Sequence, residues 1–115
     1  MTNYYIYAVL LKGCPYSNNA LELLKNYKIK YIVKIVTSKN KEKFKMENYN
    51  TFPQIFLKKE GSIDSLFLGG YSDLNYFINT FKNNLKNLDY NITIFQNKYL
   101  WWSRKAVLRF IQLIN

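Results

Sequence analysis

The chain has a single cysteine, Cys14, and no histidine among its 115 residues. One cysteine cannot form an internal disulfide, so the sequence favours a reducing compartment over the disulfide-stabilised secreted class. The absence of histidine excludes acid–base catalysis by an imidazole and disfavours most zinc sites. We therefore predict no metal site built from protein side chains alone.

Long apolar runs are also missing. No stretch approaches the roughly 20 apolar residues that a membrane-spanning helix needs, so we expect no membrane span. The first residues lack a basic region and a small-residue cleavage site, which predicts that there is no signal peptide and that the protein is cytoplasmic or in another reducing compartment. Hydrophobic residues make up 49% of the chain, which excludes a disordered protein.

The formal net charge is +10, and acidic residues are few. Such a charge can attract anionic ligands, nucleic acid or membranes, or it can simply solvate the surface. The lysines are scattered, with the densest run at 38–45, and they form no continuous block with interleaved stacking residues. We therefore expect a solvated surface and no nucleic-acid partner.

Periodicity predicts an α/β domain over residues 1–87. Strands are expected at 4–11, 29–36, 53–59 and 63–68, and helices directly after Cys14, at 38–48 and from about residue 72, with Ser72 or Asp73 as the N-cap. The order β-α-β-α-β-β-α combines a parallel βαβ unit with an antiparallel pair, so a mixed four-stranded sheet flanked by helices is predicted.

Residues 88–115 follow the completed element order and form a predicted C-terminal extension. Its residues 91–95 suggest a short strand, and residues from about 98 onward suggest a basic and aromatic amphipathic helix. Three interpretations remain open for the apolar stripe of this helix: packing on the domain itself, self-association, or an interfacial membrane helix. We favour packing on the domain, because its surface is always within reach.

Cys14 lies between a predicted strand and a predicted helix, directly after Gly13. The first N–H groups of a helix have no intrahelical partners, and the helix dipole is positive there. A thiolate at this position is stabilised, and Lys12 is two residues away. The placement indicates a reactive thiol rather than a buried structural cysteine.

Two further motifs combine special backbone residues with polar ones. In "TFPQIF", Pro53 opens a strand, where a missing N–H is tolerated. In "GGYSDL", two glycines allow a ligand to approach the backbone, and a helix start offers N–H groups to a carboxylate while Asp73 offers an anion to an ammonium group.

Together, the three motifs resemble those of the glutaredoxin family. "CPYS" is similar to the family's "CPYC" with Ser17 in place of the second cysteine, "TFPQIF" is similar to "TVPQIF", and "GGYSDL" matches "GGYxDL". The resemblance covers residues 1 to about 86. It implies a thioredoxin-like fold and glutathione as the thiol cosubstrate.

The resemblance also implies roles for individual residues. Cys14 would be the catalytic thiol, and the glutathione-binding residues would be Lys12, Tyr16, Phe52, Pro53, Gly70, Ser72 and Asp73. A cis Phe52–Pro53 bond would present the backbone of Phe52 to the cysteinyl part of glutathione. Ser72 and Asp73 would hold its γ-glutamyl end, Lys12 its glycyl carboxylate, and Tyr16 would line the groove.

With Ser17 in the second position, the expected function is a monothiol glutathione-dependent oxidoreductase that reduces glutathione mixed disulfides. Its partners would be glutathione and glutathionylated proteins or small mixed disulfides, with the glutathione reductase system acting indirectly. Two alternatives come from other classes. One is a carrier of a [2Fe–2S] cluster ligated by protein thiolates and glutathione, and the other is a redox adaptor that binds a partner through the basic extension.

Overall fold

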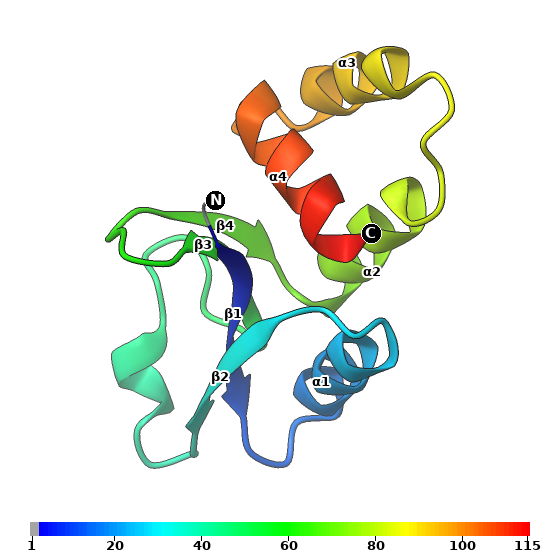
Figure 1. Ribbon diagram of the computed structural model, residues 1–115. Coiled ribbons are helices and arrows are strands. Elements are labelled where there is room, and N and C mark those ends of the chain that lie inside the picture. The colour runs from blue at the N-terminus through cyan, green and yellow to red at the C-terminus, as the bar shows by residue number, and fades with distance from the viewer. Residues whose placement is uncertain (1–2) are drawn as a thin grey trace.

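A computed structural model describes residues 3–115 (Figure 1). These residues form four strands, four α-helices and one short 3₁₀ helix. The elements are β1 (Tyr4–Leu11), α1 (Pro15–Asn26), β2 (Tyr31–Val36), η1 (Lys41–Phe44), β3 (Gln54–Lys59), β4 (Ser65–Gly69), α2 (Tyr71–Phe81), α3 (Leu88–Lys98) and α4 (Arg104–Ile114). Within the described residues, no helix is both long and apolar enough to cross a bilayer.

The four strands form one mixed sheet in the order β2-β1-β3-β4. β1 runs parallel to β2, with Ile6 opposite Tyr31, and antiparallel to β3, with Ala8 opposite Ile55. β3 and β4 are antiparallel and joined by the predicted short turn around Gly61. The predicted sheet is therefore confirmed, including its parallel and antiparallel parts.

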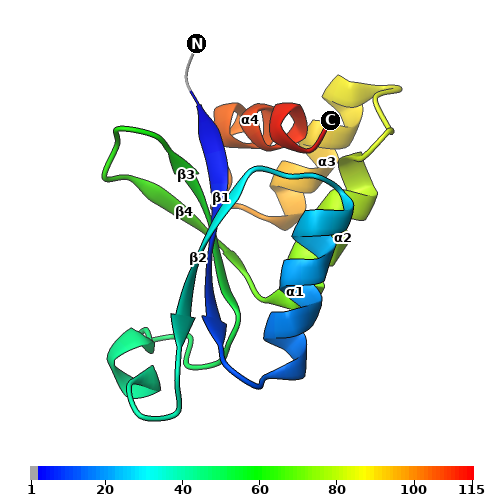
Figure 2. The same ribbon diagram turned by 60° about the horizontal axis from the view of Figure 1, so that its bottom comes forward.

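One face of the sheet carries all four α-helices (Figure 2). Side chains alternate along β1, so Ile6, Ala8 and Leu10 point toward the helices and belong to the main core. Ile55 and Leu57 of β3 and Leu68 of β4 add to this cluster from the sheet, and Ile29 adds to it from the segment before β2. The helical layer, with Trp102 from the turn between α3 and α4, contributes Ala20, Leu24, Leu74, Phe77, Ile78, Phe81, Ile92, Phe95, Trp102, Val107, Phe110, Ile111 and Ile114. The main core therefore lies between the sheet and this single helical layer.

The other face is covered differently, because the helix predicted at 38–48 does not form. Only the 3₁₀ turn η1 is present, and Phe44 packs beside the small second cluster of Val9, Val36 and Phe52. The Asn40 side chain accepts a hydrogen bond from the Thr37 N–H at 2.8 Å, which competes with helical backbone bonding. The segment also has too few apolar side chains to anchor a helix face.

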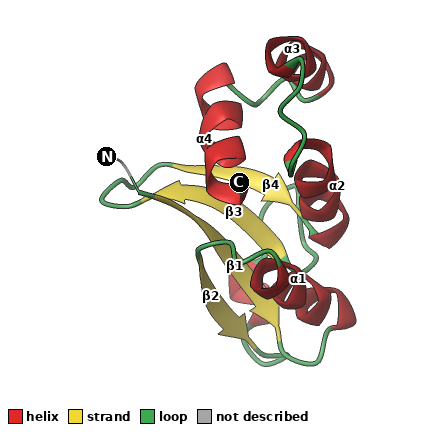
Figure 3. Ribbon diagram, turned by 45° about the vertical axis from the view of Figure 1, so that its right-hand side comes forward, coloured by secondary structure: helices red, strands yellow, loops and turns green. Residues whose placement is uncertain are grey.

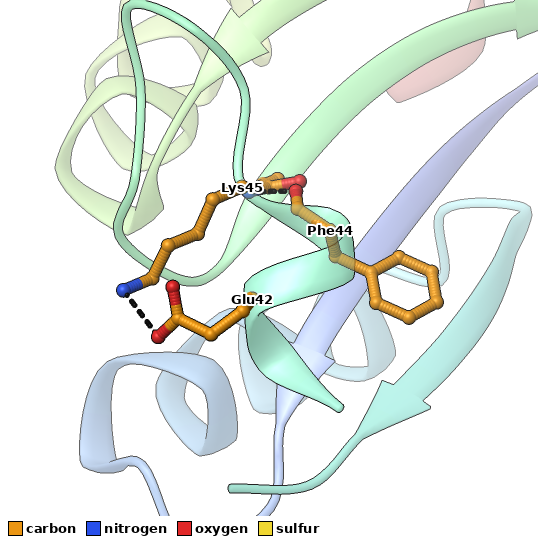
Figure 4. A network of polar contacts seen from close by, with 4 residues as sticks. Glu42, Phe44 and Lys45 are labelled. Carbon is orange, nitrogen blue, oxygen red and sulfur yellow. Dashed lines mark hydrogen bonds and ion pairs between the residues drawn. The ribbon is translucent and has the colours of Figure 1, made fainter. Parts of the chain in front are cut away.

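A single ion pair stabilises this turn (Figure 4). The Lys45 ammonium lies 2.9 Å from the Glu42 carboxylate, and this hydrogen bond is the main cause that lowers the pKa of Glu42. The Phe44 carbonyl accepts a 2.7 Å hydrogen bond from the buried Gln54 amide, which ties the loop to the start of β3. The loop thus holds the entry to β3 in place without a helix.

The strand predicted at 91–95 is wrong, because these residues lie in α3. Alternating Ile and Thr residues favour a strand locally. In the structure Ile92 and Phe95 are buried on one helix face, and the Phe95 ring lies 5.4 Å from that of Phe77. Tertiary packing of a helix face therefore overrides the local β propensity.

The second helix of the extension begins later than predicted, at Arg104. The Ser103 hydroxyl caps it by accepting a hydrogen bond from the Ala106 N–H at 3.1 Å. Leu100 and Trp101 fall within the predicted helix, but in the structure they lie in the preceding turn and are exposed. Trp102 is buried instead, with its ring 5.3 Å from Phe77.

α4 lies between α3 and the sheet (Figure 3). Its buried residues Val107, Phe110, Ile111 and Ile114 belong to the same core cluster as β1 and α2. Three hydrogen bonds join its end to the end of α2: Lys82 Nζ to the Ile114 carbonyl at 2.6 Å, the Asn83 N–H to Asn115 Oδ1 at 2.9 Å, and Asn115 Nδ2 to the Phe81 carbonyl at 3.2 Å. The apolar stripe of α4 is thus buried within the chain itself.

Candidate active site

Cys14 occupies the junction between β1 and α1. Gly13 has a φ of +82°, a conformation that favours glycine, and it turns the chain out of the strand. Cys14 is the N-cap residue of α1, and Pro15 opens the helix directly after it. The half-buried thiol therefore lies beside the N-terminal end of the helix.

The segment before β3 faces this thiol. The Phe52–Pro53 peptide bond is cis, as the resemblance implies. The Cys14 thiol lies 3.8 Å from the Phe52 carbonyl oxygen, so two segments 38 residues apart meet at this sulfur. Phe52 and Pro53 are themselves buried, which fixes the backbone that faces Cys14.

The start of α2 forms the third side. Gly70, and not Ser72 or Asp73 as predicted, is the N-cap of this helix. Asp73 stands three positions later, and its carboxylate accepts the Gly70 N–H at 2.9 Å, which satisfies a free donor of the helix start. The predicted N-cap is wrong because the glycine backbone bends the chain before the polar residues are reached.

Both glycines before α2 lie in close contact with polar side chains of the site. A Cβ at Gly69, which has a φ of +121°, would lie 2.2 Å from the Asp73 carboxylate oxygen. A Cβ at Gly70 would lie 2.5 Å from the Tyr49 hydroxyl. Side chains at these positions would displace two polar groups of the site.

These segments enclose an open cavity of about 300 Å³. It is lined by Tyr16, Tyr49, Thr51, Phe52, Pro53, Gly70, Tyr71, Ser72 and Asp73. Six of the residues singled out in the sequence thus meet in one cavity, and Cys14 lies at its edge through its contact with Phe52. Lys12 is exposed and does not line this cavity.

The sequence motifs missed Tyr49, Thr51 and Tyr71 as lining residues. Tyr49 packs edge-on against Phe67, with ring centroids 4.8 Å apart, and its hydroxyl reaches the backbone of Gly70. Thr51 and Tyr71 lie inside the two motifs, so the motifs themselves could have indicated them. Tyr49 lies outside any motif, and only the path of the 37–53 loop brings it to the cavity.

Ser17, in the position of the missing second cysteine, is buried with 1% of its surface exposed. Its hydroxyl oxygen accepts the Leu11 N–H at 3.0 Å. β3 begins opposite Val9, so no β3 residue pairs with Leu11. Ser17 therefore satisfies a backbone donor that the sheet leaves unpaired.

The site brings one thiol together with hydroxyl, carboxylate and backbone groups. In the part of the chain that the structure describes, no group of three or more Cys, Asp or Glu side chains is close enough to hold a metal ion. The chemistry available is that of one half-buried thiol beside a cavity with polar backbone groups, hydroxyls and a carboxylate.

Comparison with known proteins agrees with this geometry. The family model described as Glutaredoxin matches residues 4–61, slightly more than half of the chain. No curated protein matched the sequence. The mixed sheet with its helical layer is consistent with the thioredoxin-like fold of that family, whose members are thiol–disulfide oxidoreductases. The chain therefore belongs to the glutaredoxin family.

Proposed function

We propose that the protein is a glutathione-dependent thiol–disulfide oxidoreductase that reduces glutathione mixed disulfides through Cys14 alone. The observation that carries this proposal is the cavity in which the three sequence motifs meet at the side of the only thiol. A single reactive thiol suffices for exchange with glutathione, because glutathione itself supplies the second thiol.

In the first step, the Cys14 thiolate attacks the glutathione sulfur of a mixed disulfide. A bond forms between Cys14 Sγ and that sulfur, the original disulfide breaks, and the substrate leaves as a thiolate. In the second step, a glutathione thiolate attacks the sulfur of the glutathione bound to Cys14. Glutathione disulfide leaves, and the Cys14 thiolate is restored.

The cavity would bind the glutathione half of the mixed disulfide and leave the other half in solvent. The backbone of Phe52, whose carbonyl oxygen lies 3.8 Å from the Cys14 thiol, would pair with the extended peptide of glutathione. Asp73 is exposed, and one of its carboxylate oxygens accepts the Gly70 N–H at the start of α2. The other oxygen can accept a hydrogen bond from an ammonium group of the ligand. This division favours many substrates that share only glutathione.

The test is a glutathione-coupled reduction of a glutathionylated peptide by the wild-type protein and by Cys14→Ser. We expect turnover by the wild type and none by the variant, because Cys14 is the only thiol. Intact mass spectrometry after incubation with glutathione disulfide should detect one added glutathione on the wild type only. Turnover by Cys14→Ser, or a wild type that is correctly folded but inert, would refute the proposal.

A further inference from the structure

The sheet face opposite the α-helices carries a row of apolar side chains that crosses all four strands. Ile32 of β2 pairs with Tyr7 of β1, Tyr7 pairs with Phe56 of β3, and Phe56 pairs with Phe67 of β4. The ring centroids of Tyr7 and Phe56 are 6.2 Å apart, and those of Phe56 and Phe67 are 5.3 Å apart. Ile32, Tyr7, Phe56 and Phe67 together form the aromatic row. The sequence pattern does not predict this row, because each of its residues lies on a different strand.

Lysines flank the aromatic row on both sides. Lys34 lies in the next row toward the active site, opposite Val9. Lys58 lies in the next row on the other side, between Tyr5 and Ser65, and its ammonium is 4.2 Å from the centre of the Tyr7 ring. Strand pairing therefore places aromatic and basic side chains next to each other, although they are far apart in the sequence.

Only part of this face is covered. Phe44 of η1 packs on the cluster of Val9, Val36 and Phe52, at the end of the sheet near Cys14, and this cluster borders Tyr7 and Phe56. Tyr49 of the same loop packs edge-on against Phe67, with ring centroids 4.8 Å apart. All four α-helices lie on the opposite face (Figure 2). In the aromatic row Ile32 is 51% exposed and the three rings keep only part of their surface exposed, so the row is partly accessible from solvent in this structure.

The charges around the row favour an anionic partner. The loop beside it adds Lys39, Lys41, Lys43 and Lys45 against the acidic Glu42 and Glu47. Lys45 is paired with Glu42, and at the far edge Lys30 is paired with Glu60 at 3.6 Å. Lys34, Lys58, Lys39, Lys41 and Lys43 have no ion-pair partner among the residues that the structure describes.

We propose that this face binds single-stranded nucleic acid. Bases would stack on Tyr7, Phe56 and Phe67, and the lysines on either side would contact the phosphates. Neighbouring strands are about 4.8 Å apart, so the row has the width for about three nucleotides. Aromatic side chains on an open four-stranded sheet recognise unpaired bases in this manner.

The arrangement of aromatic rings between lysines favours single-stranded nucleic acid over other anionic partners. A lipid surface would favour apolar side chains that project beyond the polar ones, whereas here the rings lie between the strands' lysines and are half-buried. A duplex hides its bases and would use the lysines alone. Each nucleotide of a single strand presents an unpaired base that can stack on a ring and a phosphate that can contact a lysine. This combination fits a surface on which aromatic rings lie beside lysines.

The test measures the fluorescence anisotropy of short labelled oligouridylate and oligothymidylate, with a duplex and anionic vesicles as competitors. The lysine variant is Lys34→Glu with Lys58→Glu. Its matched control is Lys25→Glu with Lys86→Glu, which removes the same charge elsewhere. The aromatic variant is Phe56→Leu with Phe67→Leu, which keeps apolar volume, and thermal melting checks that each variant is folded.

We expect the lysine variant to bind at least about 10-fold more weakly than wild type and to reduce the slope of log affinity against log salt by about 1 to 2. The aromatic variant should also lose about 10-fold, with an unchanged salt slope. The control should change affinity by less than about 3-fold.

Four results would overturn the proposal: no binding by wild type at low salt, an equal loss in the control, full affinity in a folded aromatic variant, or competition by vesicles or duplex as strong as by single strands. Equal losses in the control would indicate attraction to net charge alone. Strong competition by vesicles would indicate a lipid-binding surface.

Discussion

The candidate site around Cys14 and the C-terminal extension, residues 88–115, differ in the kind of residues on which they depend. Around Cys14, a few residues in special backbone conformations form the site, including a cis peptide bond and glycines with positive φ. Residues 88–115 contain no such motif, yet they contribute seven buried side chains to the main core, namely Ile92, Phe95, Trp102, Val107, Phe110, Ile111 and Ile114. Chemistry at one end and packing at the other should therefore respond separately to mutation.

The sharpest way to test this separation is Trp102→Ala. The Trp102 ring contacts Phe77, Phe95 and Phe110 at centroid distances of 5.3, 5.2 and 5.6 Å. Its removal should lower the free energy of unfolding by about 3–5 kcal/mol, because a large cavity is left in the core. Chemical denaturation measures this loss, and turnover per folded molecule should stay unchanged.

Trp102→Phe is the matched control. The buried Trp102 Nε1 has no hydrogen-bond partner among the described residues. Phenylalanine removes this unsatisfied donor while it keeps an aromatic ring, so the net cost should be about 1 kcal/mol or less. A Trp102→Ala protein that is as stable as wild type would contradict the role assigned to the extension.

The next effect should come from Asp73→Ala. Loss of a charge-assisted contact should weaken glutathione use by about 1.5–3 kcal/mol of transition-state stabilisation, measured as a change in kcat/KM for glutathione. Asp73 also caps α2, so a stability loss of about 1 kcal/mol should accompany it.

Asp73→Asn separates the two roles. The amide oxygen can still accept the Gly70 N–H, so stability should stay near that of wild type, whereas the charge is lost and glutathione use should fall. If Asp73→Asn retained full glutathione use, Asp73 would be a capping residue only.

Ser17→Cys should cost about as much stability as Asp73→Ala, but should leave the glutathione-binding groups in place. A thiol is a weaker acceptor for the Leu11 N–H than a hydroxyl, so the variant should lose about 1 kcal/mol of stability. It should gain reductase activity on protein disulfides, because two cysteines in this spacing at a helix start can close an internal disulfide. Thiol titration after mild oxidation would detect that disulfide, and its absence in a folded variant would contradict the expected geometry.

The sequence predicted the sheet and most of the cavity because the evidence is local. Gly13, Pro53 and Gly69 take backbone conformations that those residue types favour, and β1 is a short, largely buried run of apolar residues. Thr51 and Tyr71 were within the motifs but were not singled out. Lys12 is close to Cys14 in sequence, yet it does not line the cavity.

The errors occurred where distant residues decide the structure. Residues 91–95 favour a strand by themselves, but burial of Phe95 against Phe77 and Phe81 makes a helix. The 38–48 segment has a helical composition, but its side chains are exposed or only partly buried, and its contact with a buried cluster is made by Phe44. The aromatic row depends on strand register, which periodicity alone does not give.

The three hydrogen bonds between the ends of α2 and α4 make the extension a closed loop, joined at residues 81–83 and again at 114–115. A segment held at one end frays progressively from the other, whereas a segment fastened at both ends must open as a unit. Slow amide exchange in α3 and α4 should therefore report a single cooperative opening event. The extension would then behave as one foldon whose opening also exposes the core side of α2.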